Sequence, residues 1–437
     1  MKKSLLCSTA LIGATALTAG TAGAAEAPTW KLTGNANFQL YWVDQDNTNT
    51  KTKWNGSDLG NTYVQAYNQH FWNNGPDSQD HDWYFGVDEA ELQINVSGAA
   101  DNGLNYGFKI EINANTTDGP KGIADEARLQ LSGSWGTLQM GDEDGAEDIM
   151  NYGGENLMGA TGGFDGDQDD YLVRAGDVRF FEVRNTSVGG TKIWMQLTDT
   201  IGGDGTAAYN WAAPSYPTIA GDTADKTKVS YFSPRISGFQ VGASITPTPN
   251  EGDGFKADGS WENAYGIGAN YDNSFGGLRI RASAVFAAAS SNDTRFEDVS
   301  AFQVGGIVGW GPFSLGANYG DNGDSGELKW SGQNGNADAT HEESYFWDVA
   351  ASFETGPMYF AAGYFVGVKE IDYFGDSTYE HIALTADYTV APGLGVYAEI
   401  NLISDELVDA LGPAITDADE TNSHDTTSMV IGANISF

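Results

Sequence analysis

The feature that most constrains this chain is a two-residue alternation of apolar and polar side chains, which runs from Trp30 to the last residue. In residues 30–43 the even positions form one apolar face, made of Trp30, Leu32, Gly34, Ala36, Phe38, Leu40 and Trp42. The pattern recurs at residues 90–96, 104–115, 127–133, 278–286 and 394–402. Because successive side chains of a strand point to opposite faces, each stretch predicts a strand with one apolar side. No stretch keeps a helical period, so we expect an all-β fold.

The last strand suggests that the sheet closes on itself. Residues 427–437 alternate, with Met429, Ile431, Ala433, Ile435 and Phe437 on one face. The chain thus ends on an aromatic side chain in the middle of a strand, where the terminus of a soluble domain usually frays. In a closed barrel the last strand pairs with the first, so that no backbone edge meets hydrocarbon.

The connections between predicted strands alternate between tight turns and long polar segments. Turn residues stand at 101–103, 135–136, 189–190, 237–238, 276–277, 311–312, 356–357 and 391–393. Long polar segments occupy residues 44–82, 142–177, 200–226, 247–260, 321–343 and 405–425. This alternation is typical of a closed antiparallel transmembrane β-barrel with long extracellular loops and short periplasmic turns. It gives between about 16 and 18 strands.

The spacing of two tryptophans favours the membrane barrel over a soluble β-sandwich, which also alternates apolar and polar faces. Trp30 and Trp42 lie twelve residues apart on one face. At ~3.3 Å per residue and a tilt of ~40–45°, they are about 28–30 Å apart along the membrane normal. This separation suits an aromatic girdle at each edge of the lipid. Two core tryptophans of a long soluble strand remain the alternative.

The N-terminal residues predict a cleaved leader rather than part of the fold. Lys2 and Lys3 precede the apolar residues 5–17, and small residues follow at 22–24. This is the pattern of a signal peptide covering residues 1–24. Its apolar run is too short to cross a membrane as a helix. Residues 25–437 would then form one barrel domain. The chain's one cysteine, Cys7, lies in the leader, so no disulfide is expected.

The charge balance excludes one class of function. The chain has 60 Asp and Glu against 21 Lys and Arg, a formal net charge of −39. A nucleic-acid binder needs clustered Lys and Arg, and this surface would repel a polyanion. We therefore expect no nucleic-acid partner.

Two stretches carry a resemblance to a known family. The first, residues 86–148, contains VDEAEL (87–92), SGAADNGLNYG (97–107), DEARL (125–129) and SWGTLQMGDEDGA (134–146). The second is the last dozen residues. Both resemble Gram-negative porins, particularly alphaproteobacterial general-diffusion porins, although that family often has Phe-Gly where this chain has Trp135-Gly136. The resemblance implies a homotrimer in outer-membrane lipid of a Gram-negative bacterium, with Phe437 and Ile435 as the signal for barrel closure and for the barrel-assembly machinery.

In porins of this type one long loop folds into the barrel and narrows it, and residues 142–177 match that constriction loop. Its first carboxylates are Asp142, Glu143, Asp144, Glu147 and Asp148, and residues 142–170 contain no Lys or Arg. Strand parity points Lys109 and Arg128 into the lumen, with Arg184 as a further basic wall residue and Arg279 and Arg281 as possible extensions. Opposite charges across a narrow opening would favour small polar solutes. The alternative is a solvated external loop, with the cations balancing Glu111, Glu126 and Glu182.

These observations predict a porin through which ions and small hydrophilic solutes diffuse passively, with a modest preference for cations. A solute-selective channel is one alternative, and a secreted, calcium-binding β-rich surface protein is another. No enzymatic motif is present, and no cofactor is expected. The calcium-like run from Asp165 has Asp170 where a glycine is needed and Gly176 where a glutamate is needed. Only loosely bound Ca²⁺ is therefore predicted.

Overall fold

The computed structural model describes residues 26–45, 65–68, 83–87, 89–113, 124–166, 178–181, 183–184, 192–193, 212–248, 261–292, 296–327, 342–371, 375–406 and 423–437. The predicted signal peptide, residues 1–24, lies outside these ranges, and it stays a prediction. Within the described ranges, no helix is long and apolar enough to cross a bilayer, a finding about helices alone.

Almost all regular structure is β. The strands are β1 (Glu26–Gln45), β2 (Gln65–Asn68), β3 (Trp83–Gly86), β4 (Ala90–Ala99), β5 (Asn105–Asn113), β6 (Ala124–Gly133), β7 (Gly136–Asp142), β8 (Val178–Phe181), β9 (Val183–Arg184), β10 (Lys192–Ile193), β11 (Thr227–Phe232), β12 (Phe239–Thr246), β13 (Trp261–Phe275), β14 (Leu278–Ser291), β15 (Val299–Trp310), β16 (Phe313–Gly323), β17 (Glu342–Thr355), β18 (Met358–Ile371), β19 (Gly375–Ala391), β20 (Leu394–Glu406) and β21 (Ser423–Ser436). Among the described residues, the helices are α3 (Ala146–Ile149) and the short 3₁₀ helix η2 (Glu155–Leu157).

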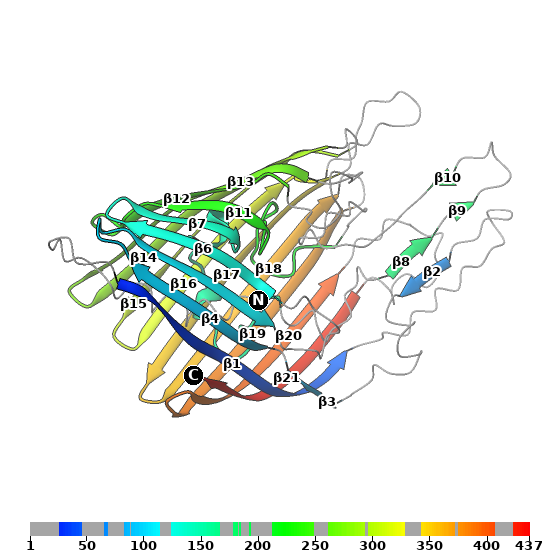
Figure 1. Ribbon diagram of the computed structural model, residues 1–437. Coiled ribbons are helices and arrows are strands. Elements are labelled where there is room, and N and C mark those ends of the chain that lie inside the picture. Colours follow the sequence, from blue (N-terminus) through cyan, green and yellow to red (C-terminus); the bar gives the residue numbers. More distant parts are fainter. Residues whose placement is uncertain are drawn as a thin grey trace.

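The main sheet is a closed antiparallel barrel (Figure 1). Its seventeen strands include β3 and β4, which pair one after the other with the same edge of β1, so the two together fill one strand position. The barrel therefore has sixteen strand positions. This confirms the predicted fold and selects the lower end of the predicted range.

The two surplus candidate strands fall in residues 178–193. There β8 pairs with β2, and β9 pairs with β10, in two separate two-stranded sheets. In the barrel wall β7 pairs directly with β11 instead. The predicted turn at residues 189–190 lies outside the described residues. Within the described residues, β8, β9 and β10 therefore add no strand to the barrel wall.

Closure joins the first strand to the last. β1 and β21 pair from Asn35 opposite Ser436 to Gln45 opposite Thr426. The register continues to the final residue, because the N–H of Phe437 donates to the carbonyl of Gly34 at 3.0 Å, and the N–H of Gly34 donates back at 3.2 Å. The predicted pairing of the last strand with the first is confirmed. Such closure leaves no unpaired strand edge at this point of the wall.

Tight turns join alternate strands at one end of the barrel, on the left in Figure 1. The turn between β13 and β14 consists of Gly276 and Gly277, which have φ angles of +55° and +87°. A two-residue hairpin with positive φ at both positions strongly favours glycine, because a Cβ is strained there. The predicted turns other than 189–190 all lie at the junctions of consecutive strands of the barrel, although Gly136 already belongs to β7 and Ala391 still belongs to β19.

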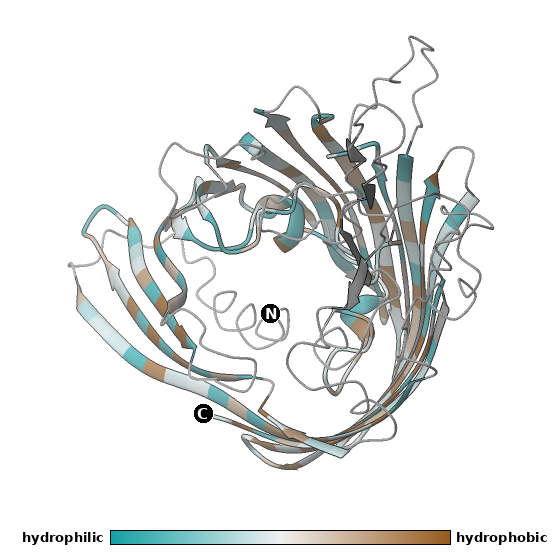
Figure 2. Ribbon diagram, turned by 90° about the vertical axis from the view of Figure 1, so that its right-hand side faces the viewer, coloured by the Kyte–Doolittle hydropathy of each residue, from teal (hydrophilic) through white to brown (hydrophobic). Residues whose placement is uncertain are grey.

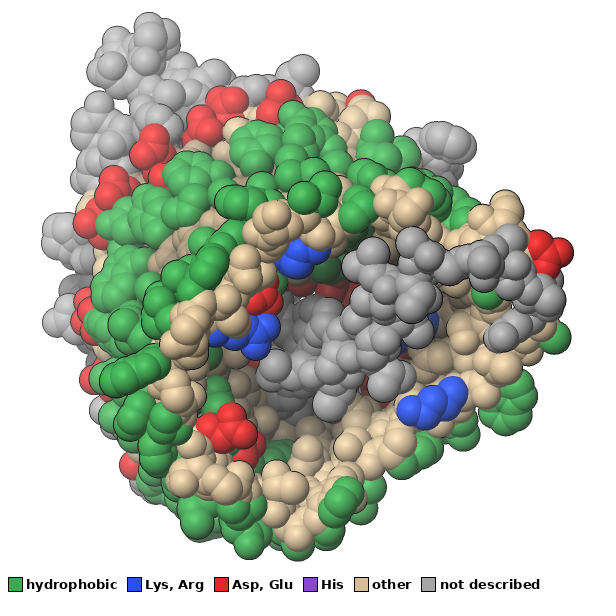
Figure 3. Space-filling view, turned by 90° about the vertical axis from the view of Figure 1, so that its left-hand side faces the viewer, with side chains coloured by type: hydrophobic (Ala, Val, Ile, Leu, Met, Phe, Trp, Pro, Cys, Tyr) green, Lys and Arg blue, Asp and Glu red, His purple; other side chains and the backbone are tan. Residues whose placement is uncertain are grey.

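The wall is apolar outside and polar inside. On β12, Val241 and Ile245 are 55% and 52% exposed, whereas the alternating Ser244 and Thr246 are 5% and 1% exposed. The apolar and polar bands alternate along the strands in Figure 2. Seen from the end with the tight turns, an apolar outer surface surrounds a hollow that carries charged side chains (Figure 3). This arrangement inverts that of a soluble protein and suits a wall between lipid and water.

Candidate functional site

The inside of the barrel holds a long segment that leaves the wall after β7. Residues 143–166 contain α3 and η2, and the short coiled ribbons lie within the ring of strands in Figure 2. The segment runs along the inner face of the wall from β12 to β20, as its hydrogen bonds show. It is the described part of the predicted constriction loop, and residues 167–177 lie outside the described residues.

The start of the segment is fixed by Glu147, a predicted pore carboxylate. The Ser244 hydroxyl donates to Glu147 Oε2 at 2.8 Å and accepts from the N–H of Ala146 at 3.1 Å. The Thr223 hydroxyl donates to Glu147 Oε1 at 3.0 Å. Glu147 is only 3% exposed. It therefore anchors α3 to the wall rather than lining an open passage.

The middle of the segment lies directly on the wall. The Asn270 amide donates to the carbonyl of Met150 at 3.2 Å, and the N–H of Tyr152 donates to Ser283 Oγ at 2.8 Å. A Cβ placed on Gly316 of β16 would come within 2.9 Å of the carbonyl oxygen of Gly153. A side chain at Gly316 would therefore push the segment off the wall, so the close approach depends on glycine.

The tip of the segment is held by two carboxylates of the wall. The N–H of Ala160 donates to both oxygens of Asp387, at 3.0 and 3.1 Å. Glu399 Oε2 accepts from the Thr161 hydroxyl at 2.7 Å, the Thr161 N–H at 3.1 Å and the Gly163 N–H at 3.3 Å. Several charge-assisted hydrogen bonds to fixed acceptors define the position of the tip.

An aromatic cluster inside the barrel completes the attachment of the tip. Phe164 stacks on Phe365 of β18, with ring centroids 5.9 Å apart, and Phe365 stacks on Phe346 of β17. His381 and Tyr379 of β19 pack edge-on beside them. These rings are almost fully buried although they lie on the inner face. They fill the space between tip and wall, so this part of the lumen is closed to water.

A second segment inside the barrel, residues 212–226, contacts both the wall and the first segment. The N–H of Ala220 donates to Asn322 Oδ1 of β16 at 2.7 Å, and the amide of Gln303 in β15 donates to the carbonyl of Pro217 at 3.3 Å. Thr223 contacts Glu147, as described above. The sequence predicted only a long polar loop here, because the partners of these backbone groups lie on distant strands.

Lys109 and Arg128 point into the lumen as predicted, but carboxylates surround them. Lys109 Nζ lies 3.1 Å from Glu126 Oε2 and also pairs with Glu111. Arg128 Nη1 lies 3.6 Å from Glu126 and pairs with Glu143 of the inward segment. All five side chains are at most 10% exposed. Glu111 and Glu126 thus balance the cations, as the alternative interpretation expected, and Glu143 joins them from the loop.

The predicted pore carboxylates therefore have different roles. Glu143 and Glu147 are buried in contacts with the wall, and Asp142, at the end of β7, accepts a hydrogen bond from the Thr227 hydroxyl. Asp144 and Asp148 are half-buried. Asp142 is half-buried as well, so three of the five carboxylates keep part of their surface exposed at the start of the segment.

Asp144 lies in an acidic environment at the start of the segment. Burial, followed by the negative charges of Asp148, Asp222 and Asp225, raises the pKa of Asp144 well above its usual value. Carboxylate oxygens of Glu126, Asp144 and Asp225 lie within 4.8 Å of one another. Three such oxygens could contribute to a calcium site. Loosely bound Ca²⁺ stays a prediction, and so does the absence of any other cofactor.

The remaining predicted basic residues lie in two places. Arg184 belongs to β9, and the only pairing of β9 within the described residues is with β10. The side chain of Arg184 is not among the described parts of the structure. Its role in the pore wall stays a prediction. Arg279 and Arg281 lie on the inner face of β14, where both approach Asp272.

Sequence reasoning did not single out the residues that hold the loop. They are polar side chains on the inward parity of separate strands: Ser244, Asn270, Ser283, Thr385, Asp387 and Glu399. Strand parity marks each of them as lumen-facing. It does not show which of them contact the loop.

Comparison with known sequences gives one family and one distant relative. A sequence model of the Gram-negative porin family matches residues 9–406. An uncharacterized protein of Rickettsia bellii (strain RML369-C) is 24% identical over 225 residues, which cover 40% of this chain and 49% of the relative. The chain thus spans about half the length of that curated relative.

Several solved outer-membrane structures are similar in fold. The anion-selective porin from Comamonas acidovorans has a TM-score of 0.54 and 13% identity, covering 94% of this chain and 100% of that chain. The trimer form of OmpT from Vibrio cholerae has a TM-score of 0.55 and 13% identity, with the same coverage. The channel DcaP of Acinetobacter baumannii has a TM-score of 0.55 and 12% identity, covering 96% and 100%. At these identities the likeness concerns the fold.

Proposed function

The chain belongs to the Gram-negative porin family, and from this premise we propose that it lets ions and small hydrophilic solutes diffuse passively across the outer membrane, with a modest preference for cations. Membership of this family and the closed barrel identify it as an outer-membrane porin channel of a Gram-negative bacterium. The solutes and the ion preference are the proposed part.

One observation carries the proposal of a size-limited pore. The segment 143–166 lies inside a wall whose inner face is polar, and side chains of β12, β13, β14, β19 and β20 hold it there by hydrogen bonds. A loop fixed inside a polar barrel narrows the lumen. It does not fill the whole cross-section of the lumen with apolar contacts. Such a constriction would pass small hydrated solutes and exclude large ones.

The charges support a modest preference for cations. Lys109 and Arg128 are balanced by buried carboxylates, so they add little positive potential to the lumen. Asp144 and Asp148 stay half-buried at the start of the loop, and the whole chain is strongly acidic. Negative charge at a mouth concentrates cations, and salt screens the effect.

Two further properties belong to this proposal. A homotrimer is supported by the likeness to the trimer form of Vibrio cholerae OmpT. Recognition of Phe437 by the barrel-assembly machinery is supported by its position, since it ends the strand that closes the barrel and is 64% exposed. We further propose that the protein acts as a channel and not as an enzyme.

Planar bilayer recording tests the proposal. Detergent-purified protein added to a bilayer in KCl should produce uniform ohmic current steps. Under a KCl gradient, the reversal potential should show a modest preference for K⁺, and this preference should shrink as the ionic strength rises. If the protein shows heat-modifiable mobility on a gel but gives no current steps, the proposed channel function would be overturned. A reversal potential of the opposite sign would overturn only the cation preference.

A further inference from the structure

His381 of β19 lies on the inner face of the wall, beside the tip of the inward loop at residues 160–164. Its side chain is fully buried, with 0% of its surface exposed. The Phe164 ring of the loop packs edge-on against the imidazole at 6.1 Å between centroids, and the Tyr379 ring does so at 6.2 Å. The imidazole Nε2 lies 2.9 Å from Asn401 Oδ1 of β20. One side chain therefore contacts both the aromatic cluster at the tip and a polar group of the wall.

Asn401 connects His381 to Glu399, one of the two carboxylates that hold the tip. Asn401 is fully buried, and its amide donates to Glu399 Oε1 at 2.9 Å. The other carboxylate oxygen, Glu399 Oε2, accepts from the N–H and the hydroxyl of Thr161 at 3.1 and 2.7 Å. The two oxygens of Glu399 thus have separate partners, because Oε1 is held by the wall and Oε2 binds the loop.

The hydrogen bonds of Asn401 determine which nitrogen of His381 carries the proton. The Asn401 amide donates to Glu399 and, at 3.3 Å, to Ser428 Oγ. Turned over, it would place its oxygen against the Glu399 carboxylate, so the amide oxygen must face His381. An amide oxygen only accepts hydrogen bonds, and the imidazole therefore donates its Nε2–H to Asn401. His381 Nδ1 is then unprotonated, and it is buried without a hydrogen-bond partner among the described residues.

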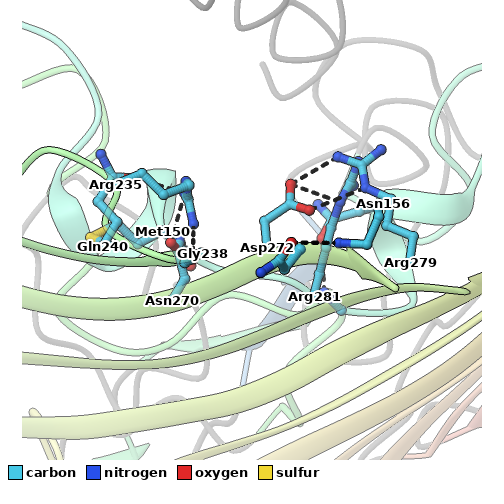
Figure 4. Close-up of polar contacts among 12 residues, drawn as sticks. Met150, Asn156, Arg235, Gly238, Gln240, Asn270, Asp272, Arg279 and Arg281 are labelled. Carbon is cyan, nitrogen blue, oxygen red and sulfur yellow. Dashed lines mark hydrogen bonds and ion pairs between the residues drawn. The ribbon is translucent and has the colours of Figure 1, made fainter. Parts of the chain in front are cut away.

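A similar relay holds the middle of the loop, as Figure 4 shows. Arg235, in the turn between β11 and β12, donates to Asn270 Oδ1 at 2.9 Å, and the Asn270 amide donates to the carbonyl of Met150 at 3.2 Å. In both relays a donor on the wall orients an asparagine oxygen, and the asparagine amide donates towards the loop. The middle relay reaches the loop directly, whereas the tip relay reaches it through a carboxylate. The tip relay begins at a buried imidazole instead of an exposed guanidinium group.

We propose that His381 is a positioning residue for the constriction: its Nε2–H orients Asn401, Asn401 fixes Glu399, and Glu399 holds the tip of the loop. Without this donor, Asn401 Oδ1 would be buried without a partner, which is costly enough to make the amide turn and release Glu399. Because the same ring packs on Phe164, His381 couples the apolar and the polar attachment of the tip. The inference rests on the proposed function, because the position of the tip is measured as current through the pore.

Two replacements of His381 separate positioning from filling of space. His381→Phe keeps an aromatic ring in the cluster and removes the donor to Asn401. His381→Gln loses the ring and keeps an N–H donor. Single-channel recording in KCl should show brief closures about ten times more often in His381→Phe than in the wild type, and at nearly the wild-type frequency in His381→Gln. The opposite order would overturn the proposal, because it would mean that the ring matters only as a filler of space.

A double-mutant cycle tests the route from His381 to the loop. In a Glu399→Ala background, His381→Phe should add no further closures, because the carboxylate that it positions is gone. Arg235→Gln is the matched comparison. It disturbs the separate relay at the middle of the loop, so its effect should add to that of His381→Phe. Additive effects of His381→Phe and Glu399→Ala would overturn the proposal.

The outcomes separate this relay from the channel itself. Normal current steps with an unchanged frequency of closures in His381→Phe would overturn the positioning role and leave the porin function intact. A wild-type protein without current steps would overturn the channel function instead. Cleavage of the loop by a broad-specificity protease in detergent gives a readout that does not depend on conduction, and it should be faster in His381→Phe than in the wild type or His381→Gln. His381→Leu, which also lacks the donor but is smaller, serves the same test if the larger ring prevents folding.

Discussion

The beginning and the tip of the inward loop are attached to the wall by different chemistry. At the beginning, Glu143 pairs with Arg128, and the Lys228 ammonium donates to the Glu143 carbonyl, so the charges of loop and wall compensate one another. At the tip, Asp387 and Glu399 accept hydrogen bonds from backbone N–H groups of the loop, and Glu399 also accepts from the Thr161 hydroxyl and the Asn401 amide. The beginning is an ion-pair cluster, and the tip is a pair of carboxylates that accept from the backbone.

This difference shows how one loop can be both anchored and adjustable. Removing one member of a buried ion pair leaves a charge without compensation, which is very costly. Removing one hydrogen-bond acceptor releases only the groups that it held. We therefore expect changes at the beginning of the loop to destabilise the whole barrel, and changes at the tip to affect mainly the loop and the current through the pore.

The largest effect is expected for Arg128→Met. It would leave Glu143 buried without its cation and Glu126 with Lys109 alone, and should lower the free energy of unfolding by about 3–5 kcal/mol. Guanidinium chloride titration in detergent, followed by tryptophan fluorescence, measures this change. The double variant Arg128→Met/Glu143→Gln should recover part of the loss, since it removes one of the uncompensated charges. A loss of stability no greater than that of Asp387→Asn would contradict the ion-pair account.

Glu399→Ala should have the next largest effect. The N–H groups of Thr161 and Gly163 would lose their acceptor, which should cost about 2–3 kcal/mol and free the tip of the loop. The single-channel current should become noisier. Glu399→Gln is the matched control, because it keeps one carbonyl oxygen and should give an intermediate result. A quiet current in Glu399→Ala would mean that the aromatic contacts of Phe164 alone fix the tip.

Asp387→Asn should have a smaller effect. Ala160 donates to both oxygens of Asp387, and the amide retains one of these acceptors without its charge. We expect a loss of about 1 kcal/mol in unfolding free energy and little change in mean conductance. The same guanidinium chloride titration measures it. A loss as large as that of Glu399→Ala would show that the charge of Asp387 matters more than its geometry.

The smallest effect concerns ion selectivity and pH. Because burial and neighbouring acids raise the pKa of Asp144, it should take up a proton at a higher pH than an ordinary carboxyl group. As the pH falls, the loss of this charge should reduce the preference for K⁺ before other carboxylates titrate. Reversal potentials in a KCl gradient at several pH values measure this. Asp144→Asn should remove the early step and lower cation selectivity modestly, and an unchanged pH profile would place Asp144 outside the conducting path.

Strand parity predicted much of the wall correctly because each strand exposes alternate residues to lipid and to the lumen. It assigned Lys109 and Arg128 to the inner face, where the structure has them. The predicted range of 16 to 18 strands includes the sixteen positions of the wall, and the candidates on either side of residues 189–190 do not pair into the wall within the described residues. A local pattern shows that a stretch can be a strand, but it does not show which neighbour it pairs with.

The sequence by itself determined that this chain forms strands with one apolar and one polar face, because the two-residue period is a local property of the backbone. Only the tertiary structure decided what the charges do. Arg128 meets Glu143, and Glu399 meets Thr161, across separations of 15 and 238 residues. Such contacts depend on where a loop comes to rest inside the barrel, and a two-residue period carries no information about that position.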